Sequence, residues 1–203
     1  MMSAKMWLCI ATVAVGTVTA AGVVTAFLLP RDFEITRTQQ IYAPRDIVWD
    51  HVAVLENHAA WSPWQAKDPT TIIRFTGPEG VGRTMSWVGK VTGEGSEMIT
   101  ALEPKHRIDT HLDLADMGTA EAWLALEATA PDTTRVTWGL TGTNEGIFGG
   151  VISAMLDTVV GGDYEDGLRR LKAIAEATPL PVSQPLPSTE PLPVEAAEDG
   201  EAG

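Results

Sequence analysis

The chain has 203 residues, of which 44% are hydrophobic, and its formal net charge at pH 7 is −13. This length supports one hydrophobic core of ordinary domain size. Nucleic acid is excluded as an expected partner, because phosphate binding needs clustered cations and the one basic cluster, Arg169, Arg170 and Lys172, lies on a predicted solvated helix face. The single cysteine, Cys9, lies in an apolar segment, so we expect no disulfide, thiolate nucleophile or cysteine-bound metal in the folded domain.

Residues 1–30 are predicted to form a membrane anchor. Residues 6–29 carry no charged side chain, and a helix of that length spans about 36 Å, more than a bilayer core of about 30 Å. A cleaved signal peptide is the alternative, because Lys5 provides a basic start and residues 18–20 are small, as at a cleavage site. The apolar run extends beyond a usual signal core of about 7–15 residues, which favours the anchor.

The orientation of this anchor is less clearly encoded, because cations flank it on both sides. Lys5 favours a cytoplasmic N-terminus, whereas Arg31, Arg37 and Arg45 favour the opposite arrangement. We expect a single-pass protein of the cell membrane with its domain on the extracytoplasmic side.

Residues 178–203 are predicted to be a disordered tail. They contain six prolines and an acidic end, a composition that favours extended, solvated chain over a packed core. A proline-rich partner motif in this tail is the alternative.

One folded domain is expected over residues 31–177, and it begins with a strand followed by a helix. Polar and apolar residues alternate over residues 33–41, which is typical of a half-buried strand. Pro44 then starts a helix, because proline fits the first helical turn but lacks an amide proton. Apolar residues recur at helical spacing as far as Leu55, and a short helical or irregular segment is predicted over residues 57–61.

Six further strands and a long helix complete the predicted elements. The strands are expected at residues 71–75, 83–88, 91–102, 106–114, 120–129 and 135–141. Helical periodicity then begins at Ile152 and continues to Ile174, with Gly161 and Gly162 as a possible bend or break. This order predicts an α+β domain in which the C-terminal helix covers an antiparallel sheet.

Several short motifs occur in a characteristic order and carry a family resemblance. They are Ile41-x-Ala43-Pro44 leading to Val48-Trp49, the WSPW of residues 61–64, the GxxGVGxxxxW of residues 77–87, Gly93-Glu94-Gly95, the strand of residues 134–138, and residues 167–172. Over residues 33–176 the chain resembles the polyketide cyclase/dehydrase and lipid transport-like branch of the START/Bet v 1 (SRPBCC) superfamily.

This resemblance implies a helix-grip fold, in which a curved antiparallel sheet wraps around the long C-terminal helix and leaves a hydrophobic cavity between them. The superfamily includes lipid carriers, aromatic cyclases and members without a known role. It has no shared catalytic signature, so we assign no catalytic residue, metal or cofactor.

Strand parity selects the side chains expected to line this cavity, because successive residues point to opposite faces of a sheet. The apolar face carries small alanines, which leave space opposite the helix. Dry packing, in which the helix fills that space, is the alternative. The candidate ligand-binding residues are Trp61, Trp64, Met85, Trp87, Ile108, Thr110, Leu112, Ala122, Leu124, Trp138, Met155, Val159, Tyr164 and Leu168. Of these, Trp61, Trp64 and Trp87 flank predicted loops and are expected at the rim of the cavity.

Two groups of polar residues have the spacing of a chemical site. Asp109, His111 and Asp113 share one strand face and have the spacing of a base or metal site, but that face is predicted to be exposed. His58 and Ser62 have the spacing of a nucleophilic pair, for which Glu56 or Asp68 would have to supply the orienting carboxylate. We interpret both as ordinary surface or turn residues.

The leading hypothesis is a membrane-anchored domain that binds or carries a hydrophobic small molecule, such as a lipid, isoprenoid or polyketide-like compound. A cyclase or dehydratase acting on a hydrophobic substrate is the second hypothesis, for which Tyr164 and His106 are the available polar groups. A non-catalytic protein-interaction module is the third.

Overall fold

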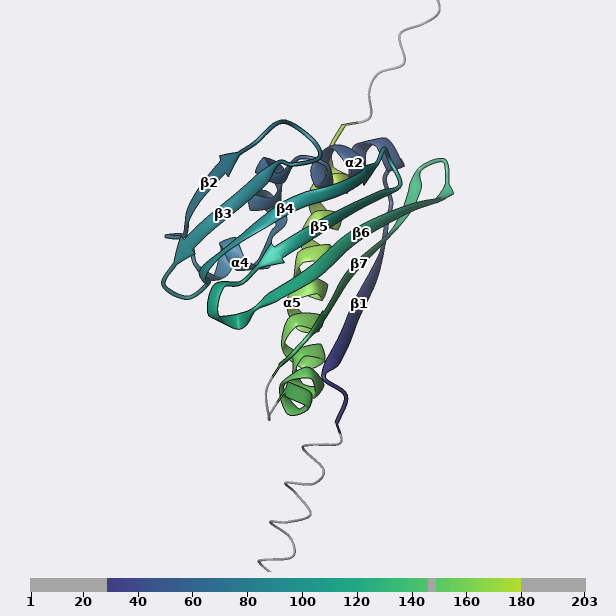
Figure 1. Cartoon of the computed structure of the whole chain (residues 1–203). Coiled ribbons are helices and arrows are strands. Elements are labelled where there is room, and N and C mark those ends of the chain that lie inside the picture. The colour runs from purple at the N-terminus through teal and green to yellow at the C-terminus, as the bar shows by residue number, and fades with distance from the viewer. Residues whose placement is uncertain (1–28, 146–148, 180–203) are drawn as a thin grey trace, which may run out of the picture.

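The computed structural model of the protein describes residues 29–145 and 149–179. The elements are β1 (Asp32–Ile41), α2 (Arg45–Val52), η1 (Leu55–Asn57), α3 (His58–Trp61), α4 (Pro63–Lys67), β2 (Ile72–Thr76), β3 (Thr84–Gly89), β4 (Gly93–Glu103), β5 (Arg107–Asp113), η2 (Ala115–Met117), β6 (Thr119–Ala130), β7 (Thr133–Thr143) and α5 (Gly149–Ala177). The strands form one antiparallel sheet in the order β1-β7-β6-β5-β4-β3-β2. The predicted α+β helix-grip architecture is therefore confirmed (Figure 1).

Two predicted segments fall almost entirely outside the described residues. They are the apolar anchor at residues 6–29 and the proline-rich tail at residues 178–203. Among the helices that the structure describes, none is long and apolar enough to cross a membrane.

The turn from β1 into α2 follows from the proline at their junction. Pro44 has the extended angles φ −55° and ψ 146°, and α2 begins at the next residue. The Thr134 hydroxyl on β7 donates a hydrogen bond of 2.8 Å to the Ala43 carbonyl and ties the turn to the sheet. The turn at Ala43-Pro44 thus directs α2 and the helices that follow it over one face of the sheet.

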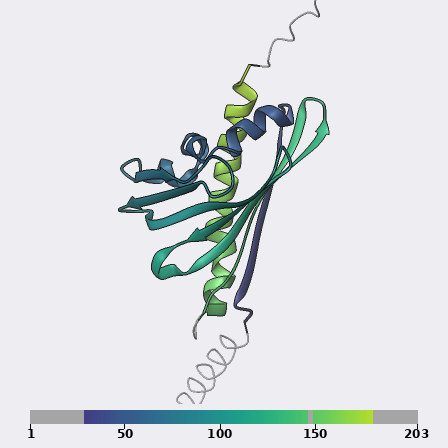
Figure 2. The same cartoon turned by 45° about the horizontal axis from the view of Figure 1, so that its top comes forward.

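The sheet curls around α5, so that its concave face is turned toward the helices (Figure 2). α5 packs mainly on β1 and β7, and α2, α3 and α4 in turn pack on α5. The strands β2 to β5 form the other side of the curl, farther along the sheet from the helix. The concave surface of β3, β4 and β5 therefore lies beside the layer formed by the helices α2 to α5, and not directly beneath α5.

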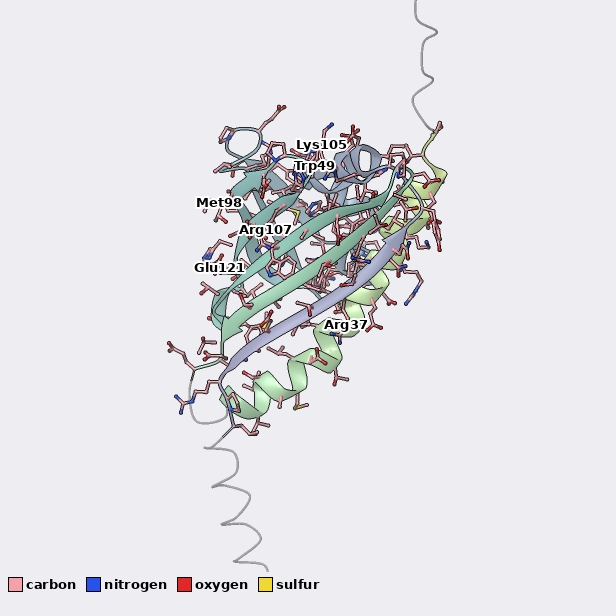
Figure 3. The ribbon with its side chains drawn as sticks, turned by 90° about the vertical axis from the view of Figure 1, so that its right-hand side faces the viewer. Arg37, Trp49, Met98, Lys105, Arg107 and Glu121 are labelled. Atoms are coloured by element: carbon pink, nitrogen blue, oxygen red, sulfur yellow. The ribbon has the colours of Figure 1, made fainter. Side chains whose placement is uncertain are left out.

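Arg37 of β1 holds α5 against the sheet (Figure 3). Its guanidinium donates to Asp157 at 2.9 Å and to Glu165 at 2.7 Å. These bonds raise the pKa of Arg37, and the guanidinium lowers the pKa of Asp157. A Cβ on Gly161 would lie 2.0 Å from the guanidinium, so glycine is needed for this close approach. α5 is continuous here, without the break considered at Gly161 and Gly162.

The predicted strand faces are confirmed over most of the sheet. On β6, Ala120, Ala122, Leu124 and Leu126 are buried, and the cross-strand partners of Leu124 and Leu126 on β7 are Trp138 and Val136, which are buried as well. The core therefore lies between the concave face and the helices, as the alternation of apolar and polar residues predicts.

Candidate functional site

The candidate site is the part of the concave face formed by β2 to β5. Several large apolar side chains here are half-buried, whereas Ile99 and Ile108 on the same face are buried like the core under α5. The half-buried side chains are Ile73, Phe75, Met85, Trp87, Leu102 and Leu112, and the core packs against all of them except Ile73 and Trp87. An apolar surface that the fold leaves partly open is the usual wall of a small-molecule site.

A single carboxylate interrupts this apolar surface. Glu97 of β4 pairs directly with Met85 of β3 on one side and with Leu112 of β5 on the other. Side chains of directly paired residues share one face of a sheet, so the Glu97 carboxylate lies on the concave side between two apolar neighbours. Among the described residues, no side chain forms an ion pair or hydrogen bond with it that would account for its position.

Sequence reasoning missed Glu97 because β4 contains a bulge. Ile99 pairs with Thr110 and Ala101 with Asp109, which leaves Thr100 as an extra residue. Leu102 faces inward beyond the bulge, and counting back from it by twos would place Glu97 on the outer face. The extra residue at the bulge reverses the alternation of inner and outer faces, so Glu97 lies on the concave face. The only signal in the sequence is that Ile99 and Leu102, both apolar, are an odd number of residues apart.

An aromatic cluster closes one end of the candidate site. The Tyr164 ring of α5 stacks on Trp138 with a centroid distance of 3.8 Å and an interplanar angle of 8°. Trp61 and Trp64 approach Trp138 edge-on at 5.2 and 5.7 Å. Edge-on and stacked contacts of this kind are the favourable arrangements of aromatic rings. The cluster joins α3, α4, α5 and β7 into one rigid wall.

The Tyr164 side chain is buried in this cluster. The residue is 2% exposed, and its hydroxyl is not among the fully buried polar atoms of the described residues that lack a hydrogen-bond partner. Burial raises the pKa of Tyr164, and the negative charge of Glu97 raises it further.

The match to known proteins agrees with this geometry. The model of the polyketide cyclase/dehydrase and lipid transport family matches residues 32–176. The chain belongs to this family. The resemblance to the SRPBCC superfamily found in the sequence motifs is thereby confirmed. No curated protein matches the sequence.

Solved structures of this family's fold are similar in shape but distant in sequence. Norcoclaurine synthase from Thalictrum flavum, in complex with dopamine and hydroxybenzaldehyde, has a TM-score of 0.56 and 13% identity over 73% of this chain and 90% of that chain. CalU16 from Micromonospora echinospora has a TM-score of 0.51 and 20% identity over 73% of this chain and 77% of that chain. An uncharacterised protein from Bacillus thuringiensis has a TM-score of 0.53 and 16% identity over 70% of this chain and 98% of that chain. These similarities establish the fold.

The predicted ligand-binding residues of this family member divide into three groups by exposure. The buried ones are Trp61, Ile108, Thr110, Ala122, Leu124, Trp138, Tyr164 and Leu168. The half-buried ones, Trp64, Met85, Trp87 and Leu112, face the site or its aromatic wall. The exposed ones are Met155 and Val159. Ligand contact stays a prediction for the first two groups.

The predicted inward position of Met155 and Val159 is wrong, because their side chains are 63% and 61% exposed. In this half of α5 the buried face is formed by Gly149, Gly150, Ser153 and Gly161, together with the partly buried Leu156 and Val160. Small residues allow close approach to β1, so the large apolar residues do not mark the packed face. The row of apolar residues expected to face the sheet was therefore placed on the wrong side of this half of the helix.

The predicted position of Trp61 at the rim of the cavity is also wrong. Trp61 is 1% exposed, and its indole nitrogen donates a hydrogen bond of 3.1 Å to the His51 carbonyl. Trp64 and Trp87 are half-buried. A tryptophan beside a proline turn can face either way, and here α3 turns Trp61 into the core.

The polar constellation on β5 lies on the convex face, as expected. Arg107 binds Asp109 at 2.6 Å and lies 4.6 Å from the Trp123 ring, and His111 contacts Glu121 at 2.6 Å. Arg107 and Glu121 are seen on the sheet face in Figure 3. No group of residues able to hold a metal ion occurs in residues 29–145 or 149–179.

The His58 and Ser62 pair does not form a nucleophilic site. The His58 ring is buried against Trp61 at 4.8 Å, and its Nε2 donates to the Val52 carbonyl at 2.9 Å. Both candidate carboxylates are engaged elsewhere. Glu56 is bound by Arg83, which lowers the pKa of Glu56.

Asp68, the other candidate, fastens the β3–β4 turn instead of orienting a histidine. Its carboxylate accepts from the Thr70 hydroxyl at 2.6 Å and from the Val91 amide at 3.0 Å. These bonds lower the pKa of Asp68 to about 2, the Thr70 hydroxyl contributing most. Gly89 leaves the space for it, since a Cβ there would lie 2.8 Å from the carboxylate.

A separate groove of about 590 Å³ lies between α2, α3 and the C-terminal end of α5. Its walls include Ile47, His51, Ala60, Ile174 and Thr178. None of the predicted ligand-binding residues lines it. It lies where the proline-rich tail begins, apart from the concave face of β2 to β5.

Proposed function

We propose that this protein binds or carries a hydrophobic small molecule on the concave face of β3, β4 and β5. The observation that carries the proposal is the row of half-buried apolar side chains on that face, of which Met85 and Leu112 flank Glu97. A ligand there would cover apolar surface that the fold alone leaves partly in water, and each buried Å² contributes about 25 cal/mol. Family membership supports the same reading, since the family includes lipid transport.

Filling the site with a larger side chain tests this proposal. In a Leu112→Trp variant, the indole occupies the concave space, and we expect recovery of co-purified ligand to fall about tenfold or more. The measurement is native mass spectrometry of the chain expressed in cells. The matched control is Val88→Trp, because Val88 is exposed on the neighbouring strand β3, on the opposite face. Equal ligand content in the two variants, or none in the wild type, would refute binding at this face.

The second candidate is an enzyme of the cyclase or dehydratase type. It is supported by the Glu97 carboxylate and the Tyr164 hydroxyl, because proton transfer needs a titratable group beside the substrate. The same experiment separates the candidates. A carrier returns its extracted ligand with unchanged mass and chromatographic retention after incubation. A dehydratase returns a product lighter by one water, and a cyclase returns an isomer of the same mass with a different retention.

We also propose that residues 6–29 tether the domain to the cell membrane, with the domain on the extracytoplasmic side. Supporting this, Leu29, where the apolar run ends, lies against Gly150 at the start of α5. Ser153 donates a hydrogen bond of 2.6 Å to the Arg31 carbonyl at the same end. The exposed apolar residues Ile152, Met155 and Val159 follow directly on α5. A lipid surface at this end would cover them.

The tether predicts how the chain partitions. We expect the full chain to stay with the membrane fraction after alkaline carbonate washing, and a chain that starts at Pro30 to be released, because only the former holds the apolar run. Protease added outside intact spheroplasts should digest the domain. A full chain found in the wash would contradict the tether, and a protected domain would contradict its orientation alone.

A further inference from the structure

We propose that the outer face of the first half of α5 docks on the lipid bilayer, with Ile152, Met155 and Val159 in the headgroup layer and the helix inclined to the bilayer plane. This inference rests on the tether proposed above and specifies which side of the domain meets the lipid. The partner is the lipid surface itself, and burial of apolar side chains is the interaction that binds it.

The three side chains form one exposed apolar stripe. Steps of three and four residues place them on the same face of α5, and they are 47%, 63% and 61% exposed. The buried residues of this half, such as Ser153 and Gly161, lie on the side that faces β1. Single exposed apolar residues are ordinary, but three on successive turns of one face indicate an interaction surface.

The stripe is confined to the half of α5 that lies beside the start of β1 (Figure 1). Continued with the same spacing beyond Val159, this face carries Asp166 and Arg170. Asp166 pairs with Arg169 at 2.8 Å, and both side chains are largely in water. The outer face thus changes from apolar to charged along a single helix. A bilayer at the β1 end accounts for this change, because only the first turns of α5 reach it.

The chain has no slack between the apolar run and this stripe. A Cβ on Gly150 would lie 2.6 Å from the Leu29 side chain, so the end of the run touches the first turn of α5. The Arg31 carbonyl accepts hydrogen bonds from the Ser153 hydroxyl at 2.6 Å and from the Asn144 amide at 3.0 Å. A run that enters the bilayer therefore holds the stripe at the lipid surface.

The length of the stripe determines the inclination of the helix. Val159 is nine residues beyond Gly150, which corresponds to about 13 Å along the helix axis. The headgroup layer of each leaflet is only about 5–8 Å thick. An upright helix would leave Val159 in water, whereas an inclined one brings all three side chains into the layer. The chain has a formal net charge of −13, so apolar burial and not charge favours this contact.

The test places a fluorescent dye on the stripe. In the full chain, Cys9→Ser removes the single native cysteine, and Met155→Cys, Val159→Cys or Ala173→Cys supplies one site for the dye. The chains are reconstituted in phosphatidylcholine nanodiscs with or without a nitroxide at carbon 5 of the acyl chains. Ala173 is the matched control, because it is exposed on the same helix face about 27 Å beyond Met155. We expect about twofold quenching at Met155 and Val159 and none at Ala173.

A charge on the stripe provides the second measurement. Ile152→Asp, in the chain labelled at Met155, should remove the quenching, because a carboxylate is costly to bury in lipid. Its control is Ala154→Asp, which adds the same charge at an exposed position about 160° around the helix from Ile152. Quenching should persist in this control. Equal effects of the two substitutions would mean that added negative charge alone repels the domain, and would overturn the docking face.

The remaining outcomes separate this inference from the tether. A full chain that does not enter nanodiscs and is released by carbonate washing refutes the tether itself. A chain that is retained, but shows no quenching at Met155 or equal quenching at Ala173, refutes only the docking face. A blue shift of the Met155 dye that occurs without quenching, and only in nanodiscs holding two chains, would assign the stripe to a second copy and overturn the lipid surface as its partner.

Discussion

Replacing Trp138 with alanine is expected to lower the free energy of unfolding by about 3–5 kcal/mol. The indole of this buried residue stacks on Tyr164 at 3.8 Å and receives the edges of Trp61 and Trp64. Its removal leaves a cavity where four elements meet, and the neighbouring rings cannot collapse into it without losing their own contacts. Urea denaturation followed by circular dichroism measures the change.

The matched control for this variant is Trp123→Ala. Trp123 is half-buried on the adjacent strand β6, on the convex face, where it packs against Arg107 at 4.6 Å. We expect a clearly smaller loss there, because solvent fills the space. Equal losses for the two variants would show that the aromatic cluster has no special role in stability. Trp138→Phe should recover part of the lost stability, since a smaller ring can still stack on Tyr164.

Gly167→Ala is expected to destabilise the protein by about 1–3 kcal/mol, although alanine is the better helix former. A Cβ at this position would lie 2.8 Å from the Trp138 ring and 3.1 Å from Pro63. The ring is fixed by Tyr164, so it cannot yield. α5 would have to move away from α4 and the sheet. The midpoint of thermal unfolding measures the effect.

Gly162→Ala on the same helix provides the control with the opposite sign. Nothing lies within 4 Å of the Cβ that this substitution adds. We therefore expect the free energy of unfolding to rise by about 0.4–1 kcal/mol, because alanine reduces the conformational entropy of the unfolded chain. If both substitutions stabilise the protein, the close packing of α5 on Trp138 is incorrect.

These variants concern the wall that gives the candidate site its shape. Trp138 and Tyr164 stack in the core of the sheet whose strands β3 to β5 carry Met85, Glu97 and Leu112. Since the wall depends on the position of α5, Gly167→Ala should weaken ligand binding as well as stability. Gly162→Ala should leave ligand binding unchanged.

Much of the fold could be predicted from local patterns. Alternation on β5, β6 and β7 identified the buried faces, because each of these strands has water on one side and the core on the other. Pro44 placed the start of α2 for a backbone reason that needs no tertiary contact. The residues that form the aromatic cluster were also found, although Trp61 was assigned to the rim and not to the core.

The sequence by itself determined the order of elements, the strand faces and the family, since these depend on spacing along the chain. Only the tertiary structure decided three things. The bulge at Thr100 turned Glu97 to the concave side, the glycines of α5 set which helix face packs on β1, and α3 placed Trp61 inside the core. Each depends on how segments far apart in the sequence meet. Which residues of a strand or helix face the core can be counted along the chain only from a residue known to be buried, and packing alone decides which residue that is.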